Sequence, residues 1–179
     1  MERVDEIMKQ RGFTIVELLI VIVVIAILAA ITIVAYNGIQ TRARESKMNM
    51  DLMNISKAIQ AARNNTSKTF NQISGSGYSS GACVSKAVGT DLAALPASDG
   101  CWVQYFDVLN DISVASGINI NNIVDPWGRP YFIDENEGEN GTNCNPDVLG
   151  VFAQPFNGAT RYPNFTVSPP KSGFTGCPI

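Results

Sequence analysis

Residues 18–35 read LLIVIVVIAILAAITIVA, and all of them except Thr32 are apolar. Counting from Phe13 lengthens the stretch to 23 residues, in which Glu17 is the one charged side chain. A membrane-spanning helix needs about 20 predominantly apolar residues. A core helix of a globular protein is rarely apolar on every side over such a length. The stretch therefore predicts a helix that can cross a membrane.

Two simple interpretations of this stretch are a plain membrane anchor and a cleavable secretory signal. A secretory signal fits less well, because its apolar core is usually shorter and ends in a small-residue cleavage site. Lys9 and Arg11 precede the stretch, so the positive-inside rule places the N-terminus in the cytoplasm and the C-terminal part outside. A plain anchor leaves Glu17 unexplained, because an ionised carboxylate in a membrane is costly unless it is paired.

Charges and helix breakers are unevenly distributed. The chain has a net charge of −3 and no histidine, which excludes every histidine-dependent nucleophile and removes the commonest zinc ligand. Residues 36–70 carry six Lys or Arg against two acids, whereas residues 71–179 carry four against ten. All nine prolines lie at or after Pro96, and Gly38 is the one helix breaker in residues 13–74. The first third can form one long helix, and the remainder must be rich in turns.

Residues 36–63 extend the helical pattern beyond the apolar stretch. An apolar stripe, whose members are three or four residues apart, consists of Met48, Leu52, Ile55, Ile59 and Ala62. This spacing is typical of one side of an amphipathic helix, and we expect the stripe to pack under a C-terminal sheet. A helix from residue 14 to about residue 63 would be ~75 Å long at the standard rise per residue.

The string Arg11-Gly-Phe-Thr-Ile-Val-Glu17, followed directly by the apolar stretch, resembles the class III signal of type IV pilins and pseudopilins. It combines a basic pre-sequence, glycine, phenylalanine, threonine and a glutamate at fixed spacing. The resemblance implies that prepilin peptidase cuts between Gly12 and Phe13 and that the new Phe13 amine is N-methylated. It also implies that the apolar helix is first a membrane anchor and later the core of a filament.

This resemblance implies an assembly role for Glu17. In the filament, a neighbouring subunit can offer the free amine of its Phe13 to this carboxylate. Charge pairing is strong in a low-dielectric bundle, and leaving either partner unpaired is costly. The pairing would therefore select one axial stagger between subunits, as a buried polar residue sets the register of a coiled coil.

The fold that the resemblance implies is the α+β pilin fold, with a long N-terminal helix packed against a small antiparallel sheet. We expect a cleaved leader at 1–12, a transmembrane and filament-core helix at 13–36, an amphipathic second half at 37–65 and a disulfide-stapled head at 66–179. Residues 71–100 are small, polar and glycine-rich and suit an irregular linking loop. Short, turn-bounded runs predict strands at Cys101–Leu109, Pro130–Ile133, Val148–Ala153 and Tyr162–Val167.

Four cysteines lie in the expected head, at Cys83, Cys101, Cys144 and Cys177. An even number in an exported domain indicates disulfides, and three connectivities are possible. Pairing in chain order, Cys83 with Cys101 and Cys144 with Cys177, closes the shorter loops. The second bridge would also resemble the C-terminal disulfide-bounded region of type IV pilins.

Asp125-Pro-Trp-Gly128 has Asp, Pro and Gly where a type I turn favours them. Its continuation, DPWGRPY, is similar to a turn of the major pseudopilins of type II secretion, in which a downstream acidic loop binds calcium. Here the candidate ligands are Asp134, Glu135, Glu137 and Glu139, and carboxylates are what calcium prefers. The spacing is not that of an EF-hand, and a solvated acidic loop is the alternative interpretation.

These patterns indicate a structural subunit of a type IV pilus that serves adhesion, twitching motility or DNA uptake. The alternatives are a pseudopilin of a type II secretion or competence system and a membrane-tethered extracytoplasmic binding protein. We expect a single-pass precursor in the cytoplasmic membrane and then an extracellular filament at the cell surface. No pattern of catalytic residues indicates an enzyme, and calcium is the one candidate cofactor.

The expected partners are other copies of the chain, prepilin peptidase, the pilus assembly platform, minor pilins and, before assembly, the membrane. The basic residues of 36–70 could contact DNA, anionic lipid or the acidic head of the next subunit. The next subunit is favoured, because no aromatic side chains are interleaved with these charges to stack on bases.

Overall fold

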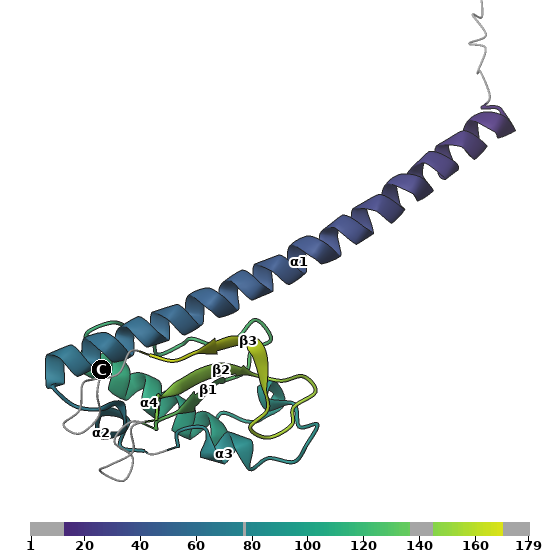
Figure 1. Ribbon diagram of the computed structural model, residues 1–179. Coiled ribbons are helices and arrows are strands. Elements are labelled where there is room, and N and C mark those ends of the chain that lie inside the picture. Colours follow the sequence, from purple (N-terminus) through teal and green to yellow (C-terminus); the bar gives the residue numbers. More distant parts are fainter. Residues whose placement is uncertain (1–12, 77, 137–144, 170–179) are drawn as a thin grey trace, which may run out of the picture. The chain divides into compact units, whose positions relative to one another are not determined.

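The computed structural model describes residues 13–76, 78–136 and 145–169. The chain divides into two compact units, Met1–Ala43 and Arg44–Ile179. Helix α1 (Ile15–Thr66) contributes its first part to one unit and its second part to the other. The uninterrupted long helix that the sequence predicts is thus confirmed (Figure 1).

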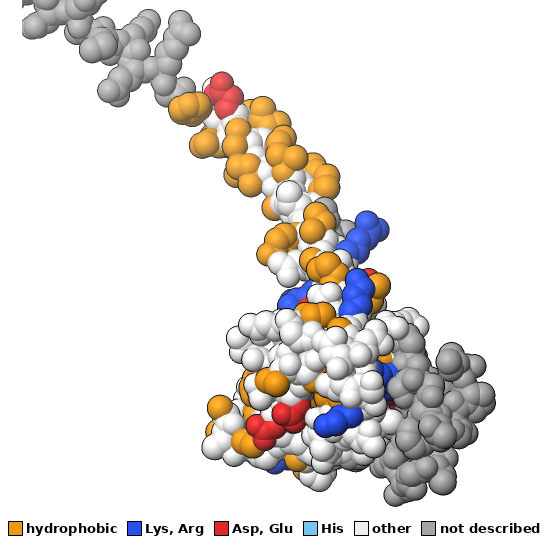
Figure 2. Space-filling view, turned by 90° about the vertical axis from the view of Figure 1, so that its left-hand side faces the viewer, with side chains coloured by type: hydrophobic (Ala, Val, Ile, Leu, Met, Phe, Trp, Pro, Cys, Tyr) orange, Lys and Arg blue, Asp and Glu red, His pale blue; other side chains and the backbone are white. Residues whose placement is uncertain are grey.

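In the first unit, no other described residue covers a side of α1. Its large apolar side chains between Ile15 and Ile33 are between 49% and 80% exposed, and hydrophobic side chains cover most of the face seen in Figure 2. The Thr32 hydroxyl donates to the Leu28 carbonyl oxygen at 2.7 Å. Even the polar side chain in this stretch therefore satisfies its hydrogen bond within the helix.

The second unit combines the end of α1 with further helices and a three-stranded sheet. These elements are α2 (Phe70–Ser74), α3 (Gly81–Val84), the 3-10 helix η1 (Leu92–Ala94), α4 (Gly100–Ser116), β1 (Tyr131–Asp134), β2 (Val148–Phe152) and β3 (Arg161–Val167). The strands are in the order β1-β2-β3, and both pairings are antiparallel. The α+β architecture and the three C-terminal strands agree with the prediction.

The core of the second unit is built on the predicted stripe of α1. Met48, Leu52, Ile55, Ile59 and Ala62 are all buried. All of these except Ala62 belong to an apolar layer that the sheet and α4 complete, with Tyr105 and Ile112 from α4 and Tyr131 and Val151 from the sheet among its members. The stripe therefore packs against α4 as well as against the predicted sheet.

The prediction of a strand at Cys101–Leu109 is wrong, because these residues lie in α4. The Asp99 side chain accepts a hydrogen bond from the Cys101 amide at 2.8 Å and caps the helix. Gly117, with a φ of 74°, ends it in the left-handed conformation. The side chains that face the core follow a helical period, with spacings of four, three and four between Cys101, Tyr105, Val108 and Ile112. This period makes the segment a helix, although its aromatic and β-branched content is typical of a strand.

Residues 71–100 are also more regular than the predicted linking loop. They contain most of α2, all of α3 and η1. Thr69 caps α2 through a capping box with Gln72. Each segment is at most five residues long, too short to leave a clear periodic signal in the sequence.

Polar contacts tie α1 to the strands. Asp51 accepts hydrogen bonds from Lys47 at 2.5 Å and from the Tyr131 hydroxyl at 2.7 Å. Burial raises the pKa of Tyr131, so this hydroxyl stays a donor. Near the end of the helix, Arg63 and Asp147 form a buried ion pair. Removal of either partner would leave the other charge buried and unpaired, which is costly. The pair therefore holds α1 to the chain segment before β2.

Candidate functional site

The described chain begins at the predicted cleavage point, with Phe13, and Gly12 lies outside the described residues. Thr14 is the residue before α1, and its amide and hydroxyl both donate to Glu17 Oε2, at 2.8 and 2.7 Å. In return the Glu17 amide donates to Thr14 Oγ1 at 3.2 Å. This reciprocal arrangement is a capping box, which satisfies amides that the first turn of a helix cannot pair.

The sequence reasoning did not single out the capping role of Thr14, although the Thr-x-x-Glu spacing was a signal for it. The box fixes the Glu17 carboxylate at the start of α1, one turn from Phe13. The side-chain bonds of this carboxylate to described residues all use Oε2. Oε1 therefore remains as an acceptor for a donor from another molecule.

Among the described helices, α1 is the one that is long and apolar enough to cross a membrane. The apolar window of α1 is not buried by the chain itself. Exposed apolar surface of this size marks a contact with lipid or with other protein surfaces. An all-round apolar surface of this kind suits a helix that lies in a bilayer or in a bundle of other helices.

Two of the four cysteines lie in the described part of the chain. Cys83 and Cys101 form the predicted disulfide, which joins α3 to the start of α4. Both are buried beside Leu92, Phe132 and Phe152. Cys144 and Cys177 lie outside the described residues, so their bridge stays a prediction.

Two of the four candidate calcium ligands are described. Asp134 ends β1, and Glu135 is fully buried, where it accepts hydrogen bonds from the amide and hydroxyl of Ser79. Burial raises the pKa of Glu135 to about 7, against the lowering effect of the Ser79 hydrogen bonds. Glu137 and Glu139 lie outside the described residues. In the described ranges, no group of three or more His, Cys, Asp or Glu side chains could hold a metal ion.

The DPWG segment forms the predicted turn, with the Gly128 amide donating to the Asp125 carbonyl at 2.9 Å. The Asp125 carboxylate accepts hydrogen bonds from the amides of Trp127 and Arg129 and from Arg129 Nε. The guanidinium carbons of Arg129 and Arg44 lie 5.0 and 5.7 Å from the centre of the Trp127 ring. The turn therefore has a structural role, because it connects the segment before β1 with α1 through the contact between Trp127 and Arg44.

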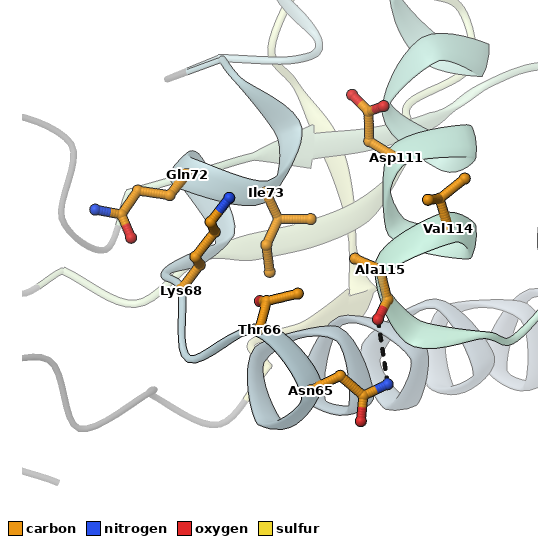
Figure 3. A pocket seen from close by; sticks show the side chains of 8 residues that line it. All are labelled: Asn65, Thr66, Lys68, Gln72, Ile73, Asp111, Val114 and Ala115. Carbon is orange, nitrogen blue, oxygen red and sulfur yellow. Dashed lines mark hydrogen bonds between the residues drawn. The ribbon is translucent and has the colours of Figure 1, made fainter.

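A pocket of about 450 Å³ lies where the end of α1, α2 and the last turns of α4 meet (Figure 3). Asn65 donates to the Ala115 carbonyl oxygen at 3.2 Å and joins the two long helices at its edge. Lys68 and Asp111 line it from opposite sides. It brings together none of the residues that the sequence singled out.

One comparison with known proteins identifies a motif. Residues 7–33 match the family model of the prokaryotic N-terminal methylation motif, which is the class III signal peptide of type IV pilins and pseudopilins. The match covers the predicted cleavage point, the capping box and most of the apolar stretch. No curated protein and no solved structure matches the chain significantly.

The motif and the apolar half of α1 indicate a membrane-anchored precursor. The matched segment is similar to the N-terminal signal of type IV pilins and pseudopilins, and the α+β architecture is pilin-like. The motif indicates a structural protein that prepilin peptidase processes and an assembly machine uses.

Proposed function

We propose that this chain is a structural subunit of a type IV pilus, which polymerises through α1 into an extracellular filament. The observation that carries the proposal is the methylation motif at residues 7–33 followed by an α1 segment that is apolar on all sides and uncovered by its own unit. A filament core of like helices would bury this surface, and burial of apolar area is the main driving force of association.

Processing precedes assembly in this proposal. Prepilin peptidase cuts between Gly12 and Phe13, and the Phe13 amine is then methylated. The precursor lies in the cytoplasmic membrane with its N-terminus in the cytoplasm, and the head lies outside, where disulfides form. The assembly platform and minor pilins then move subunits from the membrane into the filament.

Inside the filament, the Phe13 amine of one subunit pairs with Glu17 of a neighbour. The capping box supports this step, because it holds the carboxylate in place and leaves Oε1 for the incoming amine. A preorganised acceptor loses less conformational entropy when it binds.

A second candidate is a pseudopilin of a type II secretion or competence system. The DPWG turn before β1 favours it, because this turn is similar to one in major pseudopilins. The two candidates share processing, anchoring and α1-driven assembly, and they differ in whether a long surface filament forms at the natural expression level.

Electron microscopy of sheared surface material, with mass spectrometry of the subunit, tests the proposal. We expect filaments whose subunit begins at N-methylated Phe13. Gly12→Leu should abolish cleavage, because a peptidase pocket sized for glycine cannot admit the larger side chain. A chain that stays in the membrane fraction and never appears in sheared material would instead be a pseudopilin or a membrane-tethered binding protein.

A further inference from the structure

The part of α1 in the second unit has an exposed side opposite its buried stripe. This side, the α1 outer stripe, consists of Ser46, Met50, Met53, Lys57, Gln60 and Asn64, all exposed and three or four residues apart. Met50 and Met53 are 58% and 53% exposed. The stripe therefore presents two flexible apolar side chains beside the positive charge of Lys57, and methionine adapts well to a docking partner.

Helix α4 has an outer side of the opposite charge. Its members, called the α4 outer face, are Val103, Phe106, Asp107, Asn110, Asp111 and Val114, all exposed except Asp111, which is half-buried. Val114 is 77% exposed, and Figure 3 shows it close to Asp111 on α4. The outer side of a helix on a soluble domain is normally polar. Here apolar side chains surround two carboxylates.

The two carboxylates of this face repel each other. Asp107 and Asp111 are one helical turn apart, a spacing at which like charges destabilise a helix. Burial and the charge of Asp107 raise the pKa of Asp111. Lys68 lines the same pocket as Asp111. A cation brought in by a partner would relieve the repulsion.

We propose that the α4 outer face of one copy docks on the α1 outer stripe of the next copy in the filament. This inference rests on the proposed function and adds the head-to-head contact between subunits. The two surfaces match in charge and in apolar content. Both helices bury their other sides in the common core, which leaves the two surfaces for contacts between copies.

The symmetry of a filament requires this kind of contact. A head-to-tail polymer uses two different, complementary patches on each subunit, whereas a closed dimer uses one patch twice. The α1 outer stripe and the α4 outer face are separate, so one copy can use both at once. Lys57 of one copy would then face Asp107 and Asp111 of its neighbour.

Charge reversal in the full-length chain, expressed as the only subunit, tests the contact. We expect D107K/D111K to lower filament yield about fivefold or more, because exposed attraction becomes repulsion at every interface. Adding Lys57→Glu to the same chain should restore the yield, since each interface regains opposite charges. Glu45→Lys makes the same kind of charge change on an exposed α1 residue outside both surfaces and should leave the yield unchanged.

Two outcomes would overturn the contact while leaving the proposed function intact. One is a normal filament yield from D107K/D111K. The other is a low yield that Lys57→Glu does not restore although the variant head keeps its thermal midpoint. Failure of the unaltered chain to form any filament would instead count against the proposed function.

Cross-linking in sheared filaments provides a direct measurement. The double variant Met53→Cys with Val114→Cys, treated with a short bifunctional maleimide, should give a ladder of dimers, trimers and longer chains. Each single variant should stay monomeric, because a head-to-tail contact joins two different residues. Dimers from Val114→Cys alone, or no ladder from the double variant in intact filaments, would contradict the arrangement.

Discussion

The two parts of α1 form one continuous helix and yet have opposite relations to the rest of the chain. In the first unit, even Val23, which is among the more covered of its large apolar side chains, is 49% exposed. In the second unit, Leu52 is completely buried, and the exposed residues lie on the opposite side. The head therefore buries the apolar stripe of α1 in the second unit. The apolar side chains in the first unit are left for another molecule to cover.

Because of this difference, one part of α1 contributes to the stability of the head and the other part to assembly with other molecules. Burial of the stripe in the second unit stabilises the head, and burial of the apolar stretch in the first unit can stabilise only a membrane-bound or polymeric state. Substitutions in the two parts should accordingly change different measurements.

The largest effect is expected from Glu17→Leu. Loss of the carboxylate leaves the neighbouring Phe13 amine buried without a partner, a loss of about 3–5 kcal/mol by analogy with broken buried ion pairs. The variant should be cleaved and resident in the membrane, with few or no filaments in sheared material. Normal filament yield from this variant as the only subunit would show that the pairing is not needed.

Thr14→Ala is the matched control for that experiment. It removes the hydroxyl of the capping box and keeps the carboxylate, and the loss of such a cap costs about 1 kcal/mol. We expect filaments to persist at a reduced yield. If Thr14→Ala is as severe as Glu17→Leu, the role of Glu17 is to cap α1 and not to pair with a neighbour.

The same kind of substitution should have different effects on stability in the two parts of α1. Ile59→Ala removes a fully buried side chain and should lower the free energy of unfolding of the head by about 2–5 kcal/mol. Ile22→Ala, on the exposed apolar part, should leave the thermal midpoint of the detergent-solubilised chain unchanged. Equal losses of stability from the two variants would contradict the division into two units.

The buried Glu135 should make the stability of the head depend on pH. Its folded pKa of about 7 lies above the ordinary value of 4.5, so between these values the folded state binds more protons than the unfolded state. Stability from this group is full below pH 4.5 and falls as the pH rises to about 7, by about 3 kcal/mol at most. Denaturant unfolding across this range, compared with Glu135→Gln, measures the effect. A variant with the same slope would show that another group titrates.

The smallest effect is expected from calcium. If Asp134, Glu137 and Glu139 attract the ion, a chelator should lower the thermal midpoint of the chain by a few degrees, as removal of any ligand of the folded state does. Glu137→Gln with Glu139→Gln should make the midpoint insensitive to the chelator. An unaltered chain whose midpoint does not respond has no structural calcium.

The sequence by itself determined the parts of this protein that depend on local pattern. A stretch of 23 residues with one charge predicts its helix without reference to any partner, because membrane insertion depends on length and composition alone. The stripe from Met48 to Ala62 could also be predicted from the sequence, since the apolar residues of a helix with one buried side recur with a period near 3.6 residues. The Gly-Phe-Thr-x-x-Glu string is local too, and the family motif covers it.

Only the tertiary structure decided the features that depend on which surfaces meet. Residues 101–109 contain the side chains of a strand, but the cap at Asp99 and the core contacts of Tyr105 and Val108 make them a helix. Glu135 looked like a loop carboxylate and is buried against Ser79. The α4 outer face emerged only once the buried side of that helix was known. Propensity is a weak local term, and packing between distant segments overrides it.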